Sequence, residues 1–196
     1  MQIISGTARD LSADLVSKIG LYRHRVFIDT LHWNLRTEGG IERDQFDDDS
    51  TVYVVTRDEL GNLTGVARLL PTNRPYLLAE VFPQLLNGLP LPCSSEVWEL
   101  SRFAAMNFNN GPTAGHGRLL SATAAELLRA AIAYAAAHGA KRLITVSPLG
   151  IERLLRYTGV RSHRAGPPVI VDGHPLCACW IEAADTTATD ARAIAA

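Results

Sequence analysis

The chain has 196 residues, of which 47% are hydrophobic and 20% charged, and its formal net charge is -1 at pH 7. This length fits one compact domain, and the hydrophobic content is sufficient for a core, which excludes a globally disordered chain. A sequence pI near 6.6 argues against a protein whose whole surface binds nucleic acid. No stretch approaches the roughly 18–20 uninterrupted apolar residues of a membrane-spanning helix.

The N-terminal segment and the cysteines indicate the compartment. Arg9, Asp10 and Asp14 interrupt the first residues, which is not the pattern of a secretory signal peptide. Three cysteines are too few, and odd in number, for a disulfide framework. We therefore expect a protein of a reducing, cytoplasmic compartment.

Hydrophobic periodicity predicts the elements in chain order. The first is a helix over 15–31 with Ser12 as its N-cap, and a long polar loop over 32–50 follows it. The elements expected after this loop are strands at 51–57 and 63–70 joined by a turn, a short helix near 78–86, a strand at 97–104, a helix at 118–138, a strand at 142–146, a helix at 149–157, and strands at 169–171 and 175–181.

This alternation of strands and helices predicts an α/β (α+β) single domain, in which helices flank one mixed, twisted sheet. The short apolar strand at 142–146 has the composition of a central parallel strand that is buried on both faces. We place the domain at 1–182 and expect residues 183–196, rich in alanine and threonine, to form a flexible tail.

Charge is unevenly distributed along the chain. An acidic segment over 37–50 contains Glu38, Glu42, Asp44, Asp47, Asp48 and Asp49. A basic segment over 141–164 contains Lys141, Arg142, Arg153, Arg156, Arg161 and Arg164. Two solvated faces would account for this pattern, and so would two binding surfaces of opposite charge.

Several common chemistries find little support. Cys177 and Cys179 lack a histidine neighbour in the sequence, so we expect a buried pair and no metal site. No G-x-S-x-G nucleophile elbow is present. The glycines of segment 111–117 match a phosphate loop only in part, because the Walker lysine is missing, and a flexible loop is the simpler interpretation.

Charged residues inside predicted strands are the most informative feature. Arg68, Glu99 and Arg102 occupy such positions, and these residue types are seldom buried without partners. Glu99 and Ser101 share one face of their strand, whereas Arg102 lies on the other face unless a bulge intervenes. An Arg–Glu pair between neighbouring strands is one explanation. A polar pocket for a zwitterionic substrate is the other.

Residues near the N-terminus could complete such a pocket. Asp44 and Asp47 of the acidic segment would favour a cationic group. Arg23 and Phe27 are separated by four positions, so they share a helix face and could present a cation and a ring to one cavity. Core packing would also account for Phe27, and Trp33 follows just past the helix.

Several segments in order closely resemble the LuxI-type acyl-homoserine-lactone synthases, over roughly residues 10–182. The resemblance is nearest to the octanoyl-type enzymes of plant-associated β-proteobacteria. The segments that carry it are RHRVF at 23–27, Trp33, DQFD at 44–47, GVARLLPT at 65–72, WELSRFA at 98–104, TVS at 145–147, IER at 151–153 and RAGPP at 164–168.

The resemblance implies a fold similar to the GCN5-related N-acetyltransferases. It also implies the reaction: acyl-acyl-carrier protein acylates the amine of S-adenosylmethionine, the methionyl carboxylate closes to a lactone, and methylthioadenosine leaves. S-adenosylmethionine is then a substrate and no separate cofactor is expected. A medium-chain acyl group such as octanoyl is expected, with no nucleic acid, membrane or metal partner.

The resemblance also assigns roles. Glu99 is the candidate general base, assisted by Arg68 and Arg102, with a purely structural Glu99 as the alternative. The residues expected to bind S-adenosylmethionine are Arg23, Phe27, Trp33, Asp44, Asp47, Phe82, Ser101 and Phe103. Those expected in the acyl-chain pocket are Thr145, Ser147 and Leu149. Arg153 and Arg156 are expected to dock the acidic carrier protein.

Two other functions stay open from the sequence. An N-acyltransferase that uses acyl-CoA would need a pyrophosphate loop after the strand at 97–104, and Gly115 and Gly117 supply only a fragment of one. A non-enzymatic protein that binds acyl signals would leave Arg68, Glu99 and Arg102 without a role.

Overall fold

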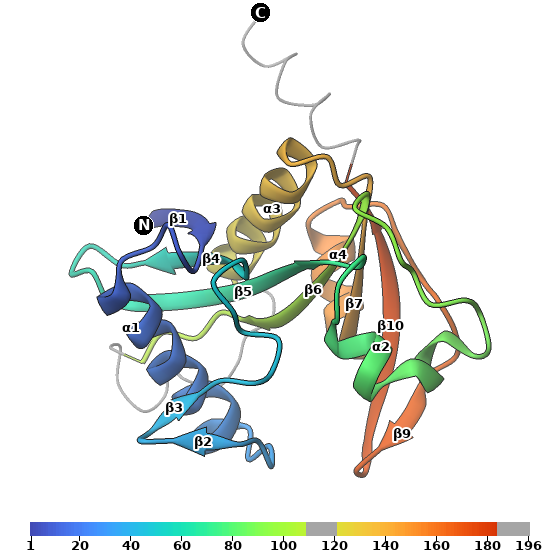
Figure 1. Cartoon of the computed structure of the whole chain (residues 1–196), viewed down its shortest axis with the longest axis horizontal. Coiled ribbons are helices and arrows are strands. Elements are labelled where there is room, and N and C mark those ends of the chain that lie inside the picture. The colour runs from blue at the N-terminus through green and yellow to red at the C-terminus, as the bar shows by residue number, and fades with distance from the viewer. Residues whose placement is uncertain (109–120, 184–196) are drawn as a thin grey trace, which may run out of the picture. The chain divides into compact units, whose positions relative to one another are not determined.

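The computed structural model describes residues 1–108 and 121–183 (Figure 1). The predicted phosphate-loop fragment at 111–117, the start of the predicted helix at 118, and the predicted tail at 183–196 apart from its first residue lie outside these residues. Ala183 itself is buried, and its backbone N–H donates to the carbonyl of Lys141 at 3.0 Å, so the expected tail begins too early. The chain forms two compact units, which we describe separately. Unit 1 comprises residues 1–68 and 102–127, and unit 2 comprises residues 69–101 and the chain from Leu128 onward.

Unit 1 contains an antiparallel arrangement of strands and the N-terminal helix. Its elements are β1 (Gln2–Thr7), α1 (Ala13–Arg23), a π-helix η1 (His24–Thr30), β2 (Thr37–Glu38), β3 (Ile41–Glu42), β4 (Val52–Arg57) and most of β5 (Leu63–Pro71). The strand order is β1-β4-β5, while β2 and β3 pair with each other as a separate hairpin. Two further elements contribute part of their length to each unit: β6 (Val97–Ala104) and α3 (Ala122–Ala137).

The first helix begins as the sequence predicts and ends differently. The backbone N–H of Leu15 donates to Ser12 Oγ at 3.2 Å, which confirms the N-cap. After Arg23, however, the helix widens into η1, where the Thr30 hydroxyl donates to the carbonyl of Arg25 at 2.8 Å. The prediction of a single α-helix over 15–31 is therefore wrong for its second half. Short π-helical turns of this kind occur frequently at functional sites.

The close approach of α1 to the β2–β3 hairpin depends on a glycine. A Cβ atom on Gly20 would lie 2.5 Å from Cγ2 of Ile41, so a larger residue would push β3 away from the helix. Ile41 immediately precedes Glu42, which is buried against α1. The expectation that segment 32–50 is entirely loop is thus corrected, because it contains the two-stranded hairpin β2–β3, which positions the buried carboxylate of Glu42.

Unit 2 contains a mixed sheet with helices. Its remaining elements are α2 (Leu77–Val81), a 3₁₀ turn η2 (Pro83–Leu86), β7 (Arg142–Pro148), α4 (Ile151–Tyr157), β8 (Ser162–Arg164), β9 (Val169–Val171) and β10 (His174–Glu182). The strand order is β6-β7-β10-β8, and β9 also pairs with β10. β6 and β7 run parallel, whereas β10 is antiparallel to β7 and β8. The predicted mixed α/β architecture is confirmed.

The differences from the predicted elements concern short or exposed segments. β1 and β8 were not predicted, since half of the residues of β1 and all of those of β8 are exposed and neither strand alternates apolar and polar side chains. The predicted helix near 78–86 divides at Pro83 into α2 and η2. Within 1–108 and 121–183, no helix combines the length and hydropathy needed to cross a membrane.

Candidate active site

A closed ring of alternating charges lies within unit 1. Every arginine of the ring contacts two carboxylates, and every carboxylate contacts two arginines. In order around the ring, the members are Arg23, Glu42, Arg102, Asp44, Arg68 and Asp47. We call this set the charged ring. It brings together all five charged residues of unit 1 that the sequence proposed, and it adds Glu42.

Arg23 links the end of α1 to two acidic residues. Its Nε donates to Glu42 Oε2 at 2.5 Å, and its two terminal nitrogens donate to the two oxygens of Asp47 at 2.8 and 2.9 Å. Burial opposes the charged form of this guanidinium, but Asp47 and Glu42 more than offset the burial, so the pKa of Arg23 is raised. Arg23 therefore stays charged inside the protein and fixes both carboxylates.

Asp47 receives more hydrogen bonds than its neighbours in the ring. Arg68 donates to it at 3.0 Å, the Tyr53 hydroxyl at 2.7 Å and the backbone N–H of Asp44 at 2.8 Å, in addition to the bidentate pair with Arg23. Burial opposes ionisation, yet Arg23 and Arg68 hold the pKa of Asp47 well below its usual range. Asp47 therefore stays ionised at neutral pH, and its hydrogen bonds hold the acidic segment in place.

Arg102 closes the ring from β6 with an unusual backbone. Its terminal Nη2 donates to Glu42 Oε1 at 3.1 Å and to Asp44 Oδ2 at 2.8 Å. The φ angle of Arg102 is +49°, in the left-handed region that a non-glycine residue rarely adopts within a strand. The simple alternation of faces along β6 is therefore interrupted here. Such backbone strain persists only where surrounding contacts enforce it.

The ring is more open to solvent on one side. The side chains of Arg23, Glu42, Arg68 and Asp47 are at most 1% exposed. Those of Asp44 and Arg102, which contact each other, are 13% and 6% exposed. Burial also lowers the pKa of Arg102, in spite of Glu42 beside it. A ligand would therefore meet Asp44 and Arg102 first, and the other four residues would hold them in place.

Aromatic rings border the charged ring. Phe27 and Trp33 stack with their centroids 4.9 Å apart, and the Arg102 guanidinium carbon lies 5.7 Å from the centroid of Phe27. Phe27 is buried in the core of unit 1, as its packing interpretation predicted, whereas Trp33 is half-buried. Trp33 thus offers more accessible aromatic surface than Phe27. Phe103 is half-buried on β6, next to Arg102 in the chain.

Two residues of this site were missed by sequence reasoning. Glu42 was noted only as part of the acidic segment, although it joins Arg23 to Arg102. Tyr53 lies within the predicted strand at 51–57 and was given no role there, although its hydroxyl donates to Asp47 and its ring is buried. The position of Glu42 two residues before Asp44 is a signal that could have indicated a further carboxylate at this site. The sequence contains no comparable signal for Tyr53, because its partner lies on another element.

The predicted general base, Glu99, belongs to unit 2 and lies on β6. Its carboxylate accepts the backbone N–H of Leu77 at 3.3 Å and that of Leu78 at 2.6 Å. These N–H groups are at the first turn of α2, whose N-cap residue Tyr76 supplies no side-chain hydrogen bond. Glu99 therefore caps α2 from a neighbouring strand. The Arg–Glu pair considered for Arg102 is formed with Glu42 on β3.

The other predicted residues of unit 2 occupy β6, β7 and the segments around α2 and α4. Thr145 and Ser147 are buried, and their hydroxyl oxygens are 2.7 Å apart. Leu149 is half-buried just before α4. Phe82 is half-buried at the C-terminal end of α2, and Ser101 is buried on β6.

The predicted docking residues are on the surface of α4. Arg153 and Arg156 are both exposed, three positions apart on this helix. Other cations of the basic segment have acidic partners: Lys141 pairs with Glu96, Arg142 with Glu182 and Arg164 with Glu152. The docking prediction thus depends on two residues of the segment and not on the whole of it.

Comparison with known proteins identifies the family. The sequence profile of the autoinducer synthases matches residues 9–190. The chain belongs to this family. An acyl-homoserine-lactone synthase from Acinetobacter nosocomialis is 53% identical over 182 residues, which cover 93% of this chain and 100% of that relative. One from Ralstonia solanacearum is 50% identical over 163 residues, covering 82% and 78% of the two chains. This autoinducer synthase is therefore an acyltransferase.

Solved structures agree with this assignment. The crystal structure of TofI in a ternary complex with an inhibitor and MTA is similar with a TM-score of 0.81 at 46% identity, covering 93% of this chain and 92% of that one. BjaI, a CoA-dependent acyl-homoserine-lactone synthase solved with SAM and isopentyl-CoA, has a TM-score of 0.81 at 25% identity, covering 94% and 84%. A protein from Lactobacillus plantarum described as an N-acetyltransferase shares the fold, with a TM-score of 0.58 at 18% identity over 92% and 97% of the chains. The expected likeness to N-acetyltransferases is confirmed for the fold.

Proposed function

We propose that this autoinducer synthase acylates the amine of S-adenosylmethionine and closes the product to an N-acyl-homoserine lactone, releasing methylthioadenosine. The single observation that carries the proposal is the charged ring, whose more open side presents one carboxylate, Asp44, beside one guanidinium, Arg102. In the proposed reaction S-adenosylmethionine is consumed as a substrate, and residues 1–182 contain the activity. A cytoplasmic location is part of the proposal.

The charges of S-adenosylmethionine suit this side of the ring. The substrate has a sulfonium, an ammonium and a carboxylate, so its site needs groups of both signs. Asp44 would bind the ammonium, and Arg102 would bind the carboxylate through its planar guanidinium. The face of Trp33 would contact the sulfonium or the adenine. The deeper residues Arg23, Glu42, Asp47 and Arg68 would orient Asp44 and Arg102 without touching the substrate.

The first chemical step needs a free amine. An ammonium must lose a proton before it attacks the thioester, and Glu99 is the proposed acceptor of that proton, directly or through one water. The carboxylate of Glu99 accepts the backbone N–H groups of Leu77 and Leu78. The same hydrogen bonds fix the orientation of the carboxylate, so capping α2 and accepting a proton are compatible roles.

The acyl chain is proposed to lie against β7. Thr145 and Ser147 would present the paired hydroxyls to the acyl group, and Leu149 would add apolar surface. A medium-length chain such as octanoyl is the expected substrate. Either hydroxyl can be the donor of the hydrogen bond that joins the two. The hydroxyl that accepts this bond keeps its own proton, which it can donate to an oxygen of the acyl group.

Acyl-carrier protein is the proposed donor, since Arg153 and Arg156 form an exposed basic surface on α4 that suits an acidic partner. The likeness to BjaI favours a second candidate, in which acyl-CoA is the donor.

Reversing both charges, Arg153→Glu with Arg156→Glu, should raise the KM for acyl-carrier protein at least tenfold and leave the KM for S-adenosylmethionine unchanged. Arg9→Glu, a reversal at an exposed arginine of unit 1, is the matched control.

The test of the reaction is mass spectrometry on purified components. The protein is incubated with S-adenosylmethionine and with acyl thioesters of increasing chain length, attached either to carrier protein or to CoA. We expect a homoserine-lactone product with one preferred acyl mass and an equal amount of methylthioadenosine. Activity with acyl-CoA alone would replace the proposed donor with the second candidate. Folded protein that yields no lactone from either donor would contradict the proposed function.

A further inference from the structure

Two cysteines of unit 2 lie side by side in the interior. Cys177 and Cys179 are two positions apart on β10, so their side chains point to the same face of the sheet. They are 0% and 1% exposed, and their sulfur atoms are 3.7 Å apart. The sequence indicated only a buried pair, because no further ligand is close to them along the chain.

The structure brings a third ligand from another element. Glu152, at the start of α4, places a carboxylate oxygen so that it and the two sulfur atoms all lie within 4.8 Å of one another. Across residues 1–108 and 121–183, this is the one group of three potential ligands that meets this spacing. It was missed in the sequence because Glu152 is 25 or more positions away from both cysteines.

The carboxylate of Glu152 is held in position by Arg164. Arg164 lies directly opposite Cys179 in the pairing of β8 with β10. Its Nε and Nη2 donate to the two oxygens of Glu152 at 2.5 and 2.8 Å. Carboxylates that bind metal ions in proteins are commonly fixed in this way by a hydrogen-bonding partner behind them.

The separation of the sulfur atoms matches tetrahedral coordination. With zinc–sulfur bonds of about 2.3 Å and tetrahedral angles, two thiolates on one ion are about 3.8 Å apart. The observed 3.7 Å agrees with that distance. A disulfide would require the atoms to approach to about 2.05 Å.

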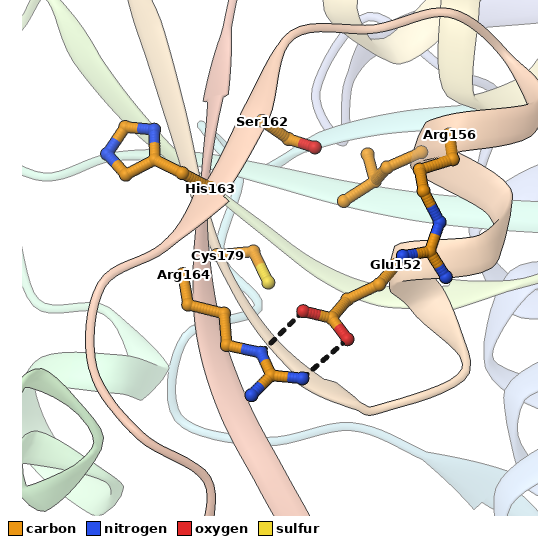
Figure 2. A pocket seen from close by; sticks show the side chains of 7 residues that line it. Glu152, Arg156, Ser162, His163, Arg164 and Cys179 are labelled. Carbon is orange, nitrogen blue, oxygen red and sulfur yellow. Dashed lines mark hydrogen bonds and ion pairs between the residues drawn. The ribbon is translucent and has the colours of Figure 1, made fainter.

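A surface pocket leads to two of the three residues, Glu152 and Cys179. A pocket of about 140 Å³ is lined by Glu152, Arg156, Ser162, Arg164 and Cys179, together with Leu155 and His163. Figure 2 shows the Cys179 sulfur and the Glu152 carboxylate on the same side of the strands, with Arg164 beside them and His163 directed to the other side. A pocket of this size holds water, which can complete the coordination of an ion.

We propose that Cys177, Cys179 and Glu152 form a binding site for a divalent thiophilic cation of the zinc class, with water as the fourth ligand. Two thiolates and one carboxylate carry three negative charges, which the ion and Arg164 together neutralise. The bound ion would join β10 to α4, the helix that carries Arg153 and Arg156. The site is independent of the proposed acyl transfer, because none of its three ligands has a role in that reaction.

Cobalt is the probe for the test, because thiolate ligands give Co²⁺ an intense near-ultraviolet absorption and tetrahedral geometry gives strong visible bands. The reduced full-length protein, freed of metal with a chelator, is titrated with Co²⁺ and then with Zn²⁺ as competitor. We expect one ion per chain and displacement of Co²⁺ by Zn²⁺. Cys177→Ser and Cys179→Ser should each reduce the thiolate absorption at saturation and bind at least 100-fold more weakly. Glu152→Gln should bind about tenfold or more weakly.

Cys93→Ser is the matched control, because Cys93 is exposed in a loop of the same unit and should have no effect. The double variant Cys177→Ala with Cys179→Ala keeps the buried face apolar and separates loss of binding from loss of folding. Folded wild-type protein without thiolate absorption would overturn the site. So would undiminished binding by the folded double variant, or equal losses in Cys93→Ser. Unchanged affinity in Glu152→Gln would overturn the assignment of Glu152 as a ligand.

Discussion

Arginines form ion pairs in both units of the molecule, but under different physical conditions. In the charged ring of unit 1, the side chains of three guanidiniums and three carboxylates are at most 13% exposed, and each residue has two partners of opposite charge. In unit 2, pairs such as Arg142 with Glu182 are open to solvent, with side chains 42% and 26% exposed.

The difference shows which charges the fold depends on. Removing one partner from a buried pair leaves an uncompensated charge and costs about 3–5 kcal/mol. An exposed pair contributes about 0–1 kcal/mol, since water and salt screen it. We therefore expect that charges of the ring determine both stability and substrate binding, whereas exposed charges act mainly on association with partners.

The largest effect is expected from opening the ring at its most connected residue. Asp47→Asn should lower the free energy of unfolding by about 3–5 kcal/mol, because Arg23 and Arg68 both lose a buried anionic partner. Urea unfolding at pH 7 measures the loss. Asp49→Asn, in the same acidic segment but exposed, should change stability by less than about 1 kcal/mol. Similar losses in the two variants would erase the distinction between buried and exposed charges.

Acid should destabilise the protein through the same residue. The folded pKa of Asp47 lies well below its unfolded value of about 3.9. The unfolded chain therefore binds the proton first, so the stabilisation is complete above about pH 5 and is lost as the pH falls through 4 and below. Urea unfolding at pH 7, 4 and 3 should show a decline in wild-type protein that is steepest below about pH 4. A smaller decline is expected in Asp47→Asn, and an identical decline in both would contradict the assignment.

Glu99→Gln tests whether a hydrogen-bonded carboxylate outside the ring also acts in catalysis. If Glu99 accepts the proton of the amine, kcat should fall about 100-fold or more while the KM for S-adenosylmethionine changes little. The pH dependence of kcat should also lose its acidic limb. A purely structural Glu99 would instead lower stability through α2 and leave the shape of the pH profile unchanged.

A smaller effect is expected from Tyr53→Phe, which keeps the buried ring and removes only the hydroxyl that donates to Asp47. Hydrogen bonds to charged groups contribute about 1.5–3 kcal/mol, so the loss of stability should lie near that range and below that of Asp47→Asn. Urea unfolding gives the value. A change near zero would exclude Tyr53 from the network that holds the acidic loop.

The smallest effect is expected at the surface. Arg142→Ala removes the ion pair with Glu182, whose two side chains are 42% and 26% exposed. The free energy of unfolding should change by less than about 1 kcal/mol. The measurement is the same urea titration, repeated at high salt, where the difference should shrink further. A loss of 3 kcal/mol or more would mean that this pair behaves like a member of the ring.

The sequence predicts the fold well where one periodic pattern covers a whole element. β6 has the predicted bounds, and the Ser12 cap and the turn between β4 and β5 are where the sequence places them. Elements whose formation depends on partners were missed. β1 exposes half of its residues and β8 all of them, so neither shows an apolar pattern, and they are strands because β4 and β10 pair with them.

The site was predictable in its residue types and not in its geometry. Charges inside strands indicated that Arg68 and Arg102 need partners, and the structure pairs them with the aspartates of the acidic segment. That these residues bind a substrate stays a prediction. The closed ring could not be predicted, because it requires Glu42 from a two-residue strand and a left-handed backbone at Arg102. Both features depend on tertiary contacts that no local sequence pattern specifies.

The central claim is that the more open side of the charged ring binds S-adenosylmethionine. Calorimetric titration of S-adenosylmethionine into wild-type, Asp44→Asn and Asp49→Asn proteins tests it most directly. We expect Asp44→Asn to raise Kd at least tenfold, because the ammonium loses its anionic partner, while Asp49→Asn binds as tightly as wild type. An unchanged Kd in folded Asp44→Asn would contradict the claim and would mean that the ring serves the fold alone.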